Sequence, residues 1–338
     1  MLVPVYNYER FIEQSLQSAL DQDYPPDRLE LVVVDDGSTD RSAELIRGMA
    51  ERNPGRITFV SQENRGQIGT IDRARREATG ELVAFLDADD VWLPDKTRKQ
   101  VAAFRAQPNV GLVFCDMTTI DEHGSTLRTT VFDPGEPQLG PVWLHARVLR
   151  TNIIYGGCTM YRAALLRDPP DVLESWDWWL AVEITARAAA GELAIGFVPE
   201  PLALYRQHGE NMLLGADGTK LVNLRRRQLR FQLWALRRVE LSVLGPRELV
   251  DIWRGPEWFA QTAAEASGSY FVDLITIGNE EREEAQRLRA SAEQAAASGD
   301  DETAVRRMFR ALTWDPYEPE AALRFYELAQ AAAASPRR

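Results

Sequence analysis

Three aspartates stand within four positions directly after an apolar run in the first third of the chain. The run Leu82–Leu86 has the composition of a buried parallel strand, and Asp87, Asp89 and Asp90 follow it. Unpaired buried carboxylates are costly and repel one another, so strand packing alone does not explain this cluster. Mg²⁺ and Mn²⁺ prefer oxygen ligands in proteins. The pattern therefore predicts that these aspartates hold a divalent cation and that the cation holds a diphosphate.

The chain before this cluster alternates between apolar strands and amphipathic helices. Strand patterns cover residues 2–6, 29–34 and 57–60, and helical patterns follow each of them. Such alternation is typical of an α/β fold with a mostly parallel sheet and helices on both faces. Because loops that follow parallel strands gather along one edge of the sheet, we expect the polar residues after these strands to share a crevice. These residues are Tyr6, Asp36, Arg65 and the aspartates of residues 87–90.

Motifs and composition exclude several other classes of protein. No strand pattern is followed by G-x-G-x-x-G or by a Walker A sequence, which excludes ordinary dinucleotide binding and a P-loop. The net charge of −12 and the pI of about 5.0 argue against a nucleic-acid partner. Two cysteines, Cys115 and Cys158, are too few for a disulfide framework, and no segment resembles a membrane span or a signal peptide. We therefore expect a cytoplasmic protein.

Four short segments, in this order and at these intervals, resemble the motifs of family 2 glycosyltransferases of the GT-A fold. The segments are Val3–Asn7, Val34–Asp40, Asn64–Gly66 and Leu86–Asp90. The resemblance is clear to about residue 115, weaker to about residue 212, and stops there. It implies a GT-A type α/β fold with a Rossmann-like nucleotide-binding half. It also implies that a sugar is transferred, with inversion, from a nucleoside-diphosphate sugar in a reaction that depends on Mn²⁺ or Mg²⁺.

The resemblance assigns four residues to the nucleotide. Pro4 and Tyr6 would line the base pocket, with the Tyr6 ring stacked on the base. Asp36 would accept a hydrogen bond from the base, which favours a uracil or thymine N–H and hence a UDP-linked donor. A plain turn residue is the alternative for Asp36. Arg65 would approach the diphosphate.

The same resemblance assigns the metal ligands. Asp89 would bridge the ribose and the metal, Asp90 would coordinate the metal, and Asp87 is the first acid of the family's D-x-D motif. The segment Leu204–His208 resembles a Tyr-Arg-x-His segment of the family, which makes His208 a candidate third ligand. Imidazole suits Mn²⁺ better than Mg²⁺. The alternative for His208 is a hydrogen-bonded surface residue.

The segment Glu174–Leu180 departs from the family pattern at its most important position. Family members carry Glu-Asp, an aromatic residue and a second Asp here, at the start of a helix, and the first Asp is the general base. Ser175 fills that position, and a hydroxyl is no general base near neutral pH without help. Asp177 is the favoured carboxylate in its place and Glu174 is the second. A site that is inactive or operates differently is the remaining alternative.

A long basic helix pattern covers residues 220–244. A helix of this type either packs on the catalytic domain with a solvated arginine face or lies on an anionic membrane surface. The second arrangement would suit a lipid-linked acceptor and a peripheral location at the inner face of the membrane.

Further helical patterns follow this basic segment. They cover residues 280–297, 303–312 and 318–334. The segment Ala304–Pro316 is similar to the end of a tetratricopeptide repeat, and one or two such units cannot form a solenoid alone. We therefore expect a GT-A catalytic domain over residues 1–215. An all-helical C-terminal region over residues 216–338 would make acceptor, membrane-surface or homo-oligomer contacts.

The leading hypothesis is a metal-dependent inverting glycosyltransferase. It would move a sugar from a nucleotide-sugar donor to a hydroxyl of a glycan, a lipid-linked saccharide or another cell-surface or secondary-metabolite acceptor, with the carboxylate near Asp177 as base. Because Ser175 stands at the usual base position, a catalytically impaired nucleotide-sugar-binding or scaffold protein is the alternative. A nucleotidyltransferase is a weaker third hypothesis, since the segment Tyr6–Arg10 lacks the Gly-rich, Lys-containing loop of such enzymes.

Overall fold

The computed structural model describes residues 1–129, 140–166, 175–209, 211, 218–254, 278–316 and 318–334. The chain forms two compact units. Unit 1 comprises Met1–Gln138, Ile154–Ile184 and Gly191–Leu214, and unit 2 comprises Leu139–Ile153, Thr185–Ala190 and Gly215–Arg338. All the candidate site residues belong to unit 1. The two domains expected from the sequence, with a boundary at residue 215, stay a prediction.

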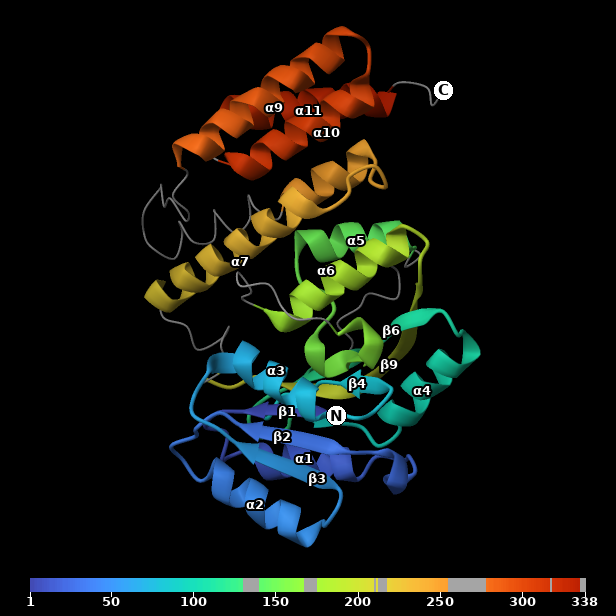
Figure 1. Cartoon of the computed structure of the whole chain (residues 1–338), viewed down its shortest axis with the longest axis vertical. Helices are drawn as coiled ribbons and strands as arrows, with labels where there is room; N and C mark the ends of the chain where they lie inside the picture. The colour runs from blue at the N-terminus through green and yellow to red at the C-terminus, as the bar shows by residue number, and fades with distance from the viewer. Residues whose placement is uncertain are drawn as a thin grey trace. The chain divides into compact units, whose positions relative to one another are not determined.

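Unit 1 begins with a three-stranded parallel sheet in the order β1–β2–β3. The strands are β1 (Leu2–Val5), β2 (Leu31–Asp35) and β3 (Ile57–Ser61), and the helices between and after them are α1 (Ile12–Leu20), α2 (Ser42–Arg52) and α3 (Gly66–Glu77). The middle strand β2 is buried along its whole length, which explains its unbroken apolar sequence. Helices α1 and α2 cover one face of this sheet and α3 covers the other (Figure 1). Right-handed crossovers require this arrangement, because the chain moves outward from β1 to β3 and then returns.

A six-stranded sheet of mixed direction completes unit 1. Its order is β4–β8–β6–β9–β5, with β7 paired to β6. The strands are β4 (Leu82–Ala84), β5 (Val91–Trp92), β6 (Val110–Ile120), β7 (Thr126–Thr129), β8 (Thr159–Arg162) and β9 (Ala194–Arg206). The pair β6–β9 is parallel and the other pairs are antiparallel. The fold class expected from the sequence, a GT-A type α/β fold, is confirmed, and its second half is less parallel than expected.

The strand before the three aspartates differs from its expected form. The apolar run predicts a parallel strand over residues 82–86, whereas β4 ends at Ala84 and pairs antiparallel with β8. A parallel bridge between Leu2 and Phe85 joins this segment to β1, and Leu86 N donates to Leu2 O at 3.0 Å. The bridge links the two sheets. Because the segment runs parallel to β1, residues 87–90 lie at the same edge of the sheet as the residues that follow β1.

One hydrophobic core runs between the two sheets and the helices of unit 1. Helix α4 (Lys96–Ala106) covers β6 and β9, short 3₁₀ turns lie at Pro26–Arg28, Gly156–Cys158 and Ala163–Leu165, and α6 (Trp176–Ala189) begins in unit 1. The core includes Val3, Leu16, Leu31, Ile46, Phe104 and Val113. Because apolar side chains from both sheets share this core, the loops at the ends of the strands have a rigid base.

The described part of unit 2 is helical. Its helices are α5 (Pro141–Arg150), α7 (Gly218–Arg238), a helix over 246–254, α9 (Asn279–Ala297), α10 (Asp301–Trp314) and α11 (Pro319–Ala334). Helix α10 packs against both α9 and α11, and the Phe309 and Phe325 rings lie 5.7 Å apart. These helices confirm the helical C-terminal extension. The likeness of Ala304–Pro316 to a tetratricopeptide repeat stays a prediction.

Helix α7 carries the positive charge that the basic pattern predicts. Residues 218–238 include six arginines, one lysine and no acidic residue. Arg237 acts inside unit 2, because its Nε donates to Thr313 O at 2.8 Å and its guanidinium lies 4.2 Å from the centre of the Trp314 ring. In the part of the chain that the structure describes, no helix has the length and apolar character needed to cross a membrane. Contact of α7 with an anionic membrane surface, and homo-oligomer formation, stay predictions.

His145 of α5 makes the stability of unit 2 sensitive to acid. The side chain is fully buried, its Nδ1 lies 2.9 Å from Thr185 Oγ1, and burial lowers its pKa to about 4. The pKa of a histidine in the unfolded chain is about 6.5, so the unfolded state binds more protons than the folded state below that pH. The free energy of unfolding therefore falls as the pH decreases from 6.5 towards 4. We expect a loss of about 2 kcal/mol at pH 5.

Urea unfolding at pH 7 and pH 5, followed by circular dichroism, checks this prediction. In a His145→Gln variant the loss between the two pH values should shrink by about 2 kcal/mol. His123→Gln is the matched control, because His123 lies exposed in the turn between β6 and β7. An unchanged pH dependence in His145→Gln would show that this histidine is not the group responsible.

Candidate active site

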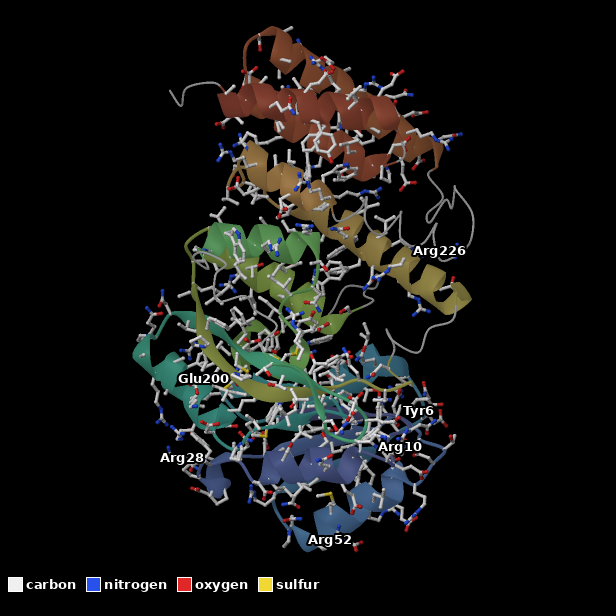
Figure 2. All side chains as sticks on the ribbon, turned by 180° about the vertical axis from the view of Figure 1, so that it is seen from behind. Tyr6, Arg10, Arg28, Arg52, Glu200 and Arg226 are labelled. Carbon is white, nitrogen blue, oxygen red and sulfur yellow. The ribbon has the colours of Figure 1, made fainter. Side chains whose placement is uncertain are left out.

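Tyr6 and Asp36 leave the first sheet at the same edge. Val5 of β1 stands opposite Asp35 of β2 in the parallel register, so the residues that follow them are neighbours at the carboxyl ends of the two strands. The Tyr6 side chain is 45% exposed and lies at the surface of unit 1 (Figure 2). Pro4, the other residue expected at the base, lies within β1 itself. An exposed ring above buried strand ends is a suitable surface for a flat ligand.

Asp36 is buried and organises the loop between β3 and α3. Its Oδ1 accepts hydrogen bonds from Gln62 Nε2 and from the backbone N–H of Arg65, each at 2.8 Å. The exposed Arg65 immediately precedes α3, so this carboxylate determines where the helix begins. One oxygen of Asp36 therefore has a structural role. Its contact with a base, and that of Arg65 with a diphosphate, stay predictions.

Arg206, the last residue of β9, holds the loop of residues 87–90 through hydrogen bonds to Asp89 and Asp90. The buried guanidinium donates from Nε to Asp89 O at 2.8 Å, and the Arg206 backbone N–H donates to Asp90 Oδ1 at 2.9 Å. Ser15 Oγ donates to Asp87 O at 3.0 Å from the other side. The guanidinium donates its other hydrogen bonds to backbone carbonyls of Asp121 and Glu122 and to Gln14 Oε1. Its charge offsets only part of the rise in the pKa of Asp90.

Asp89 is bound by two side chains from the segment after β9. His208 Nε2 lies 3.0 Å from Asp89 Oδ2, and Asn211 Nδ2 donates to the same oxygen at 3.1 Å. Phe11 of the segment before α1 packs on the imidazole, with ring centres 4.8 Å apart. The structure thus brings His208 to the aspartates, with its Nε2 directed at Asp89. Direct ligation of a metal by His208 stays a prediction.

The other two aspartates are held in an unfavourable electrostatic environment. Burial, together with the charges of Asp89 and Asp177, raises the pKa of Asp87 to about 7. Burial and the charges of Asp89 and Asp87 raise the pKa of Asp90 well above its usual range. Two such carboxylates ionise together only when a positive charge is close to both. The site is therefore arranged to attract a cation.

Two neighbouring glycines face the acidic side chains of the site and form a wall, with Gly157 towards Asp87 and Asp90 and Gly156 towards Asp177. Asp90 Oδ2 lies 3.2 Å, and Asp87 Oδ2 3.7 Å, from the position that a Cβ at Gly157 would occupy. The preceding residue, Gly156, donates its backbone N–H to Asp177 Oδ2 at 3.3 Å. A side chain at residue 157 would fill the space that both carboxylate oxygens face. This glycine is therefore required by the site and not by the backbone of a turn.

Asp177 lies in the first turn of helix α6, against Gly156. Its Oδ1 accepts hydrogen bonds from Ser175 Oγ at 2.5 Å and from the Trp178 N–H at 2.8 Å, and its Oδ2 accepts from Gly156. Ser175, which stands at the usual base position, is thus a direct partner of the favoured substitute. Glu174, the second candidate, lies outside the described residues. The assignment of the base stays a prediction.

The donor set fits a divalent cation that is completed by a second ligand. Across the described ranges, no three His, Cys, Asp or Glu side chains form a group that could hold a metal by themselves. Mg²⁺ sites of diphosphate-binding enzymes have the same character, since one or two carboxylates and the substrate phosphates share the ion. Asp87 and Asp90 supply two carboxylate oxygens around one small space beside Gly157. Burial raises the pKa of both carboxyl groups, so a bound cation would favour their ionised forms.

Several residues of the site have no clear signal in the sequence. Arg206 and Asn211 flank His208 and bind the loop of the aspartates. The resemblance to the family pattern indicated His208 but gave no role to either neighbour. Tyr8 and Tyr205 lie close enough to the three aspartates that burial and these charges raise the pKa of both phenols. Tyr8 follows β1 and Tyr205 lies in β9, and local sequence patterns do not reveal that the fold brings these two segments to the aspartates.

A three-stranded parallel sheet joined to a mixed sheet, with an aspartate cluster at the junction, is the arrangement of a GT-A type domain, and unit 1 has it. The sequence model described as glycosyl transferase family 2 matches residues 1–168. Through this domain the chain belongs to glycosyl transferase family 2. An uncharacterized glycosyltransferase of Nostoc sp. is 33% identical over 225 residues, which is 64% of this chain and 66% of that protein. The chain thus spans about two thirds of the length of that relative.

Solved structures show the same fold. The crystal structure of Staphylococcus aureus TarS 1–349 in complex with UDP-GlcNAc is 20% identical, with a TM-score of 0.55, over 98% of this chain and 90% of that one. The mannosyltransferase PcManGT from Pyrobaculum calidifontis, in complex with GDP-Man and Mn²⁺, is 22% identical. Its TM-score is 0.54 over 94% of this chain and 87% of that one. At these identities the likeness establishes the fold alone.

Proposed function

We propose that this protein is a metal-dependent inverting glycosyltransferase that uses a nucleoside-diphosphate sugar, with UDP as the favoured nucleotide. The observation that carries the proposal is the pair of buried carboxylates, Asp87 and Asp90, which face one space beside Gly157. Burial and the charges of nearby carboxylates raise the pKa of both groups. The similar TarS structure contains UDP-GlcNAc, and the similar PcManGT structure contains GDP-Man and Mn²⁺. These complexes support a nucleotide-sugar donor and a divalent ion.

In the proposed complex the base of the nucleotide stacks on the exposed ring of Tyr6, and Arg65 approaches the diphosphate. Asp87 and Asp90 would hold the cation. Asp89, oriented by His208 and Asn211, would face the ribose, and Asp89 and His208 stay candidate ligands of the same cation. A divalent cation bound there would neutralise the negative charge that develops on the departing nucleoside diphosphate.

Asp177 is the proposed general base. Its carboxylate would accept the proton of an acceptor hydroxyl as that oxygen attacks the sugar carbon from the side opposite to the leaving diphosphate. Ser175 and the Gly156 N–H hold the carboxylate next to Gly156. The adjacent residue, Gly157, bounds the space that Asp87 and Asp90 face, which is called the cation space below. The acceptor is a hydroxyl of a glycan or of a lipid-linked saccharide, because the family resemblance implies acceptors of this type.

Titration calorimetry with nucleoside diphosphates, with and without Mn²⁺, tests the proposal. UDP should bind in the presence of Mn²⁺ and much more weakly in its absence, because the acidic site repels the free diphosphate. Turnover of UDP-sugars, including slow hydrolysis, should follow. Metal-dependent UDP binding with no turnover would instead support the alternative function, a catalytically impaired nucleotide-sugar-binding or scaffold protein with Ser175 at the usual base position. UDP binding that Mn²⁺ does not change would contradict the proposed metal site.

Tyr6 provides a sharper test of the base pocket. Tyr6→Ala should weaken UDP binding about tenfold, because stacking of a base on an aromatic ring contributes about 1–3 kcal/mol. Tyr6→Phe keeps the stacking surface and should bind UDP as the wild type does. An unchanged affinity in Tyr6→Ala, measured by the same calorimetry, would show that the base binds elsewhere.

A further inference from the structure

Trp92 connects the two segments that bound the cation space. It lies in β5, two residues after Asp90, and its side chain is 2% exposed. Its indole Nε1–H donates to Gly157 O at 2.9 Å. The other side of Gly157 faces Asp90 Oδ2 and Asp87 Oδ2. One hydrogen bond thus ties the strand that follows the aspartates to the peptide that stands opposite their carboxylates.

A second pair of buried side chains supports the same peptide segment. Gln100 of α4 donates from Nε2 to Cys158 O at 2.8 Å, next to the bond from Trp92. Lys96 Nζ donates to Gln100 Oε1 at 2.8 Å and lies 3.9 Å from the centre of the Trp92 ring. Both Lys96 and Gln100 are fully buried. The lysine therefore determines which way the Gln100 amide points and packs on the indole that holds Gly157.

These contacts hold Gly157 at a set distance from the carboxylates of Asp87 and Asp90, and thus set the width of the cation space. The chain from Asp90 to Trp92, the indole bond to Gly157 and the approach of Gly157 to Asp90 form a closed loop of contacts. If the indole bond is lost, the glycine wall can move away from the carboxylates. Partners that orient the residues around a metal without touching it commonly change metal affinity by about 10- to 100-fold.

We propose that Trp92 is a positioning residue for the cation and diphosphate site, acting through the carbonyl of Gly157. The inference rests on the proposed function, because it assumes that a divalent cation binds between Asp87, Asp90 and the diphosphate. Trp92 contacts neither the cation nor the substrate. It sets the distance between the two walls that bound them.

The test measures Mn²⁺ binding directly, by electron paramagnetic resonance of free Mn²⁺, in wild type and Trp92→Phe with UDP present. Trp92→Phe keeps the buried aromatic ring and removes the donor. We expect the Kd for Mn²⁺ to rise about tenfold, which corresponds to roughly 1.4 kcal/mol. Binding of UDP in the absence of metal should stay within twofold of the wild type, because Tyr6 and Asp36 are not involved. A merely structural defect would weaken both.

Two further variants complete the experiment. Trp253→Phe is the matched control, since Trp253 is a buried tryptophan of unit 2 whose indole N–H has no hydrogen-bond partner among the described residues. It should bind Mn²⁺ as the wild type does. Gly157→Ala places a methyl group in the space that Asp90 faces, and should show the same selective loss of Mn²⁺ affinity. It decides the question if Trp92→Phe does not fold.

The outcomes separate the two proposals. Wild-type Mn²⁺ affinity in Trp92→Phe would overturn the role of Trp92 and leave the proposed function intact. A wild-type protein that binds no Mn²⁺ with UDP would overturn the proposed function and this inference with it.

Discussion

Replacing Asp90 with asparagine is expected to reduce sugar transfer by about a thousandfold or more. A cation held at this site would contribute several kcal/mol to stabilisation of the leaving diphosphate, and about 4 kcal/mol corresponds to a thousandfold in rate. Asparagine keeps the shape of Asp90 and its Oδ1 can still accept the Arg206 N–H, so the loop should keep its conformation. Steady-state transfer of sugar from a UDP-sugar, at saturating Mn²⁺, measures the effect.

The same substitution should stabilise the metal-free protein. Burial and the nearby charges raise the pKa of Asp90, which means that its ionised form is less favourable in the folded than in the unfolded state. Above the unfolded pKa this group therefore lowers the free energy of unfolding, and a neutral side chain removes that cost. Thermal unfolding without metal should show a higher midpoint for Asp90→Asn. A lower midpoint together with lost activity would indicate a folding defect and not a lost ligand.

Asp72→Asn is the matched control for Asp90→Asn. Asp72 is an aspartate of the same unit that forms ion pairs with Arg75 and Arg76 on the surface of α3. Its loss should leave transfer unchanged. Full activity in Asp90→Asn would contradict the proposed role of the aspartate cluster.

Replacing Asp177 with asparagine is expected to lower kcat by about a thousandfold with little change in donor binding. General-base catalysis typically contributes 10²- to 10⁴-fold, and asparagine cannot accept the proton of the acceptor. The amide can still accept from the Trp178 N–H, so the start of α6 should be preserved. Separate measurement of kcat and of the Kd for UDP distinguishes a lost base from a lost donor site.

Glu174→Gln and Ser175→Ala determine which residue performs this role. If Asp177 is the base, Glu174→Gln should keep most of the activity. Ser175→Ala should reduce it by about tenfold, because one hydrogen bond that orients the carboxylate is lost. A loss in Glu174→Gln that exceeds the loss in Asp177→Asn would assign the base to Glu174 instead.

Local sequence patterns were sufficient to predict the strands and helices of the first half of unit 1. The buried strand β2 has an unbroken apolar sequence, and α1 and α2 have one apolar face each, so the parallel sheet and its helices follow from periodicity. The segment 82–86 shows the limit of this reasoning. A buried apolar run does not specify direction, and the antiparallel partner of β4 lies almost eighty residues further along the chain, in β8.

The candidate site was predictable where its residues follow strands and unpredictable where they come from distant pairing. Asp36 and the aspartates of residues 87–90 follow apolar runs, and the structure brings them to the ends of neighbouring strands. The roles of Arg206, Gly157 and Trp92 depend on contacts between residues more than sixty positions apart. A sequence pattern carries no information on such contacts unless the fold is already known.

If Asp87 and Asp90 share a divalent cation with the diphosphate of the donor, a crystal grown with UDP and Mn²⁺ should reveal it by anomalous diffraction. We expect one strong manganese peak between these two carboxylates and the diphosphate, in the space beside Gly157. A well-defined UDP molecule in the crevice, with no manganese peak next to the aspartates, would contradict it.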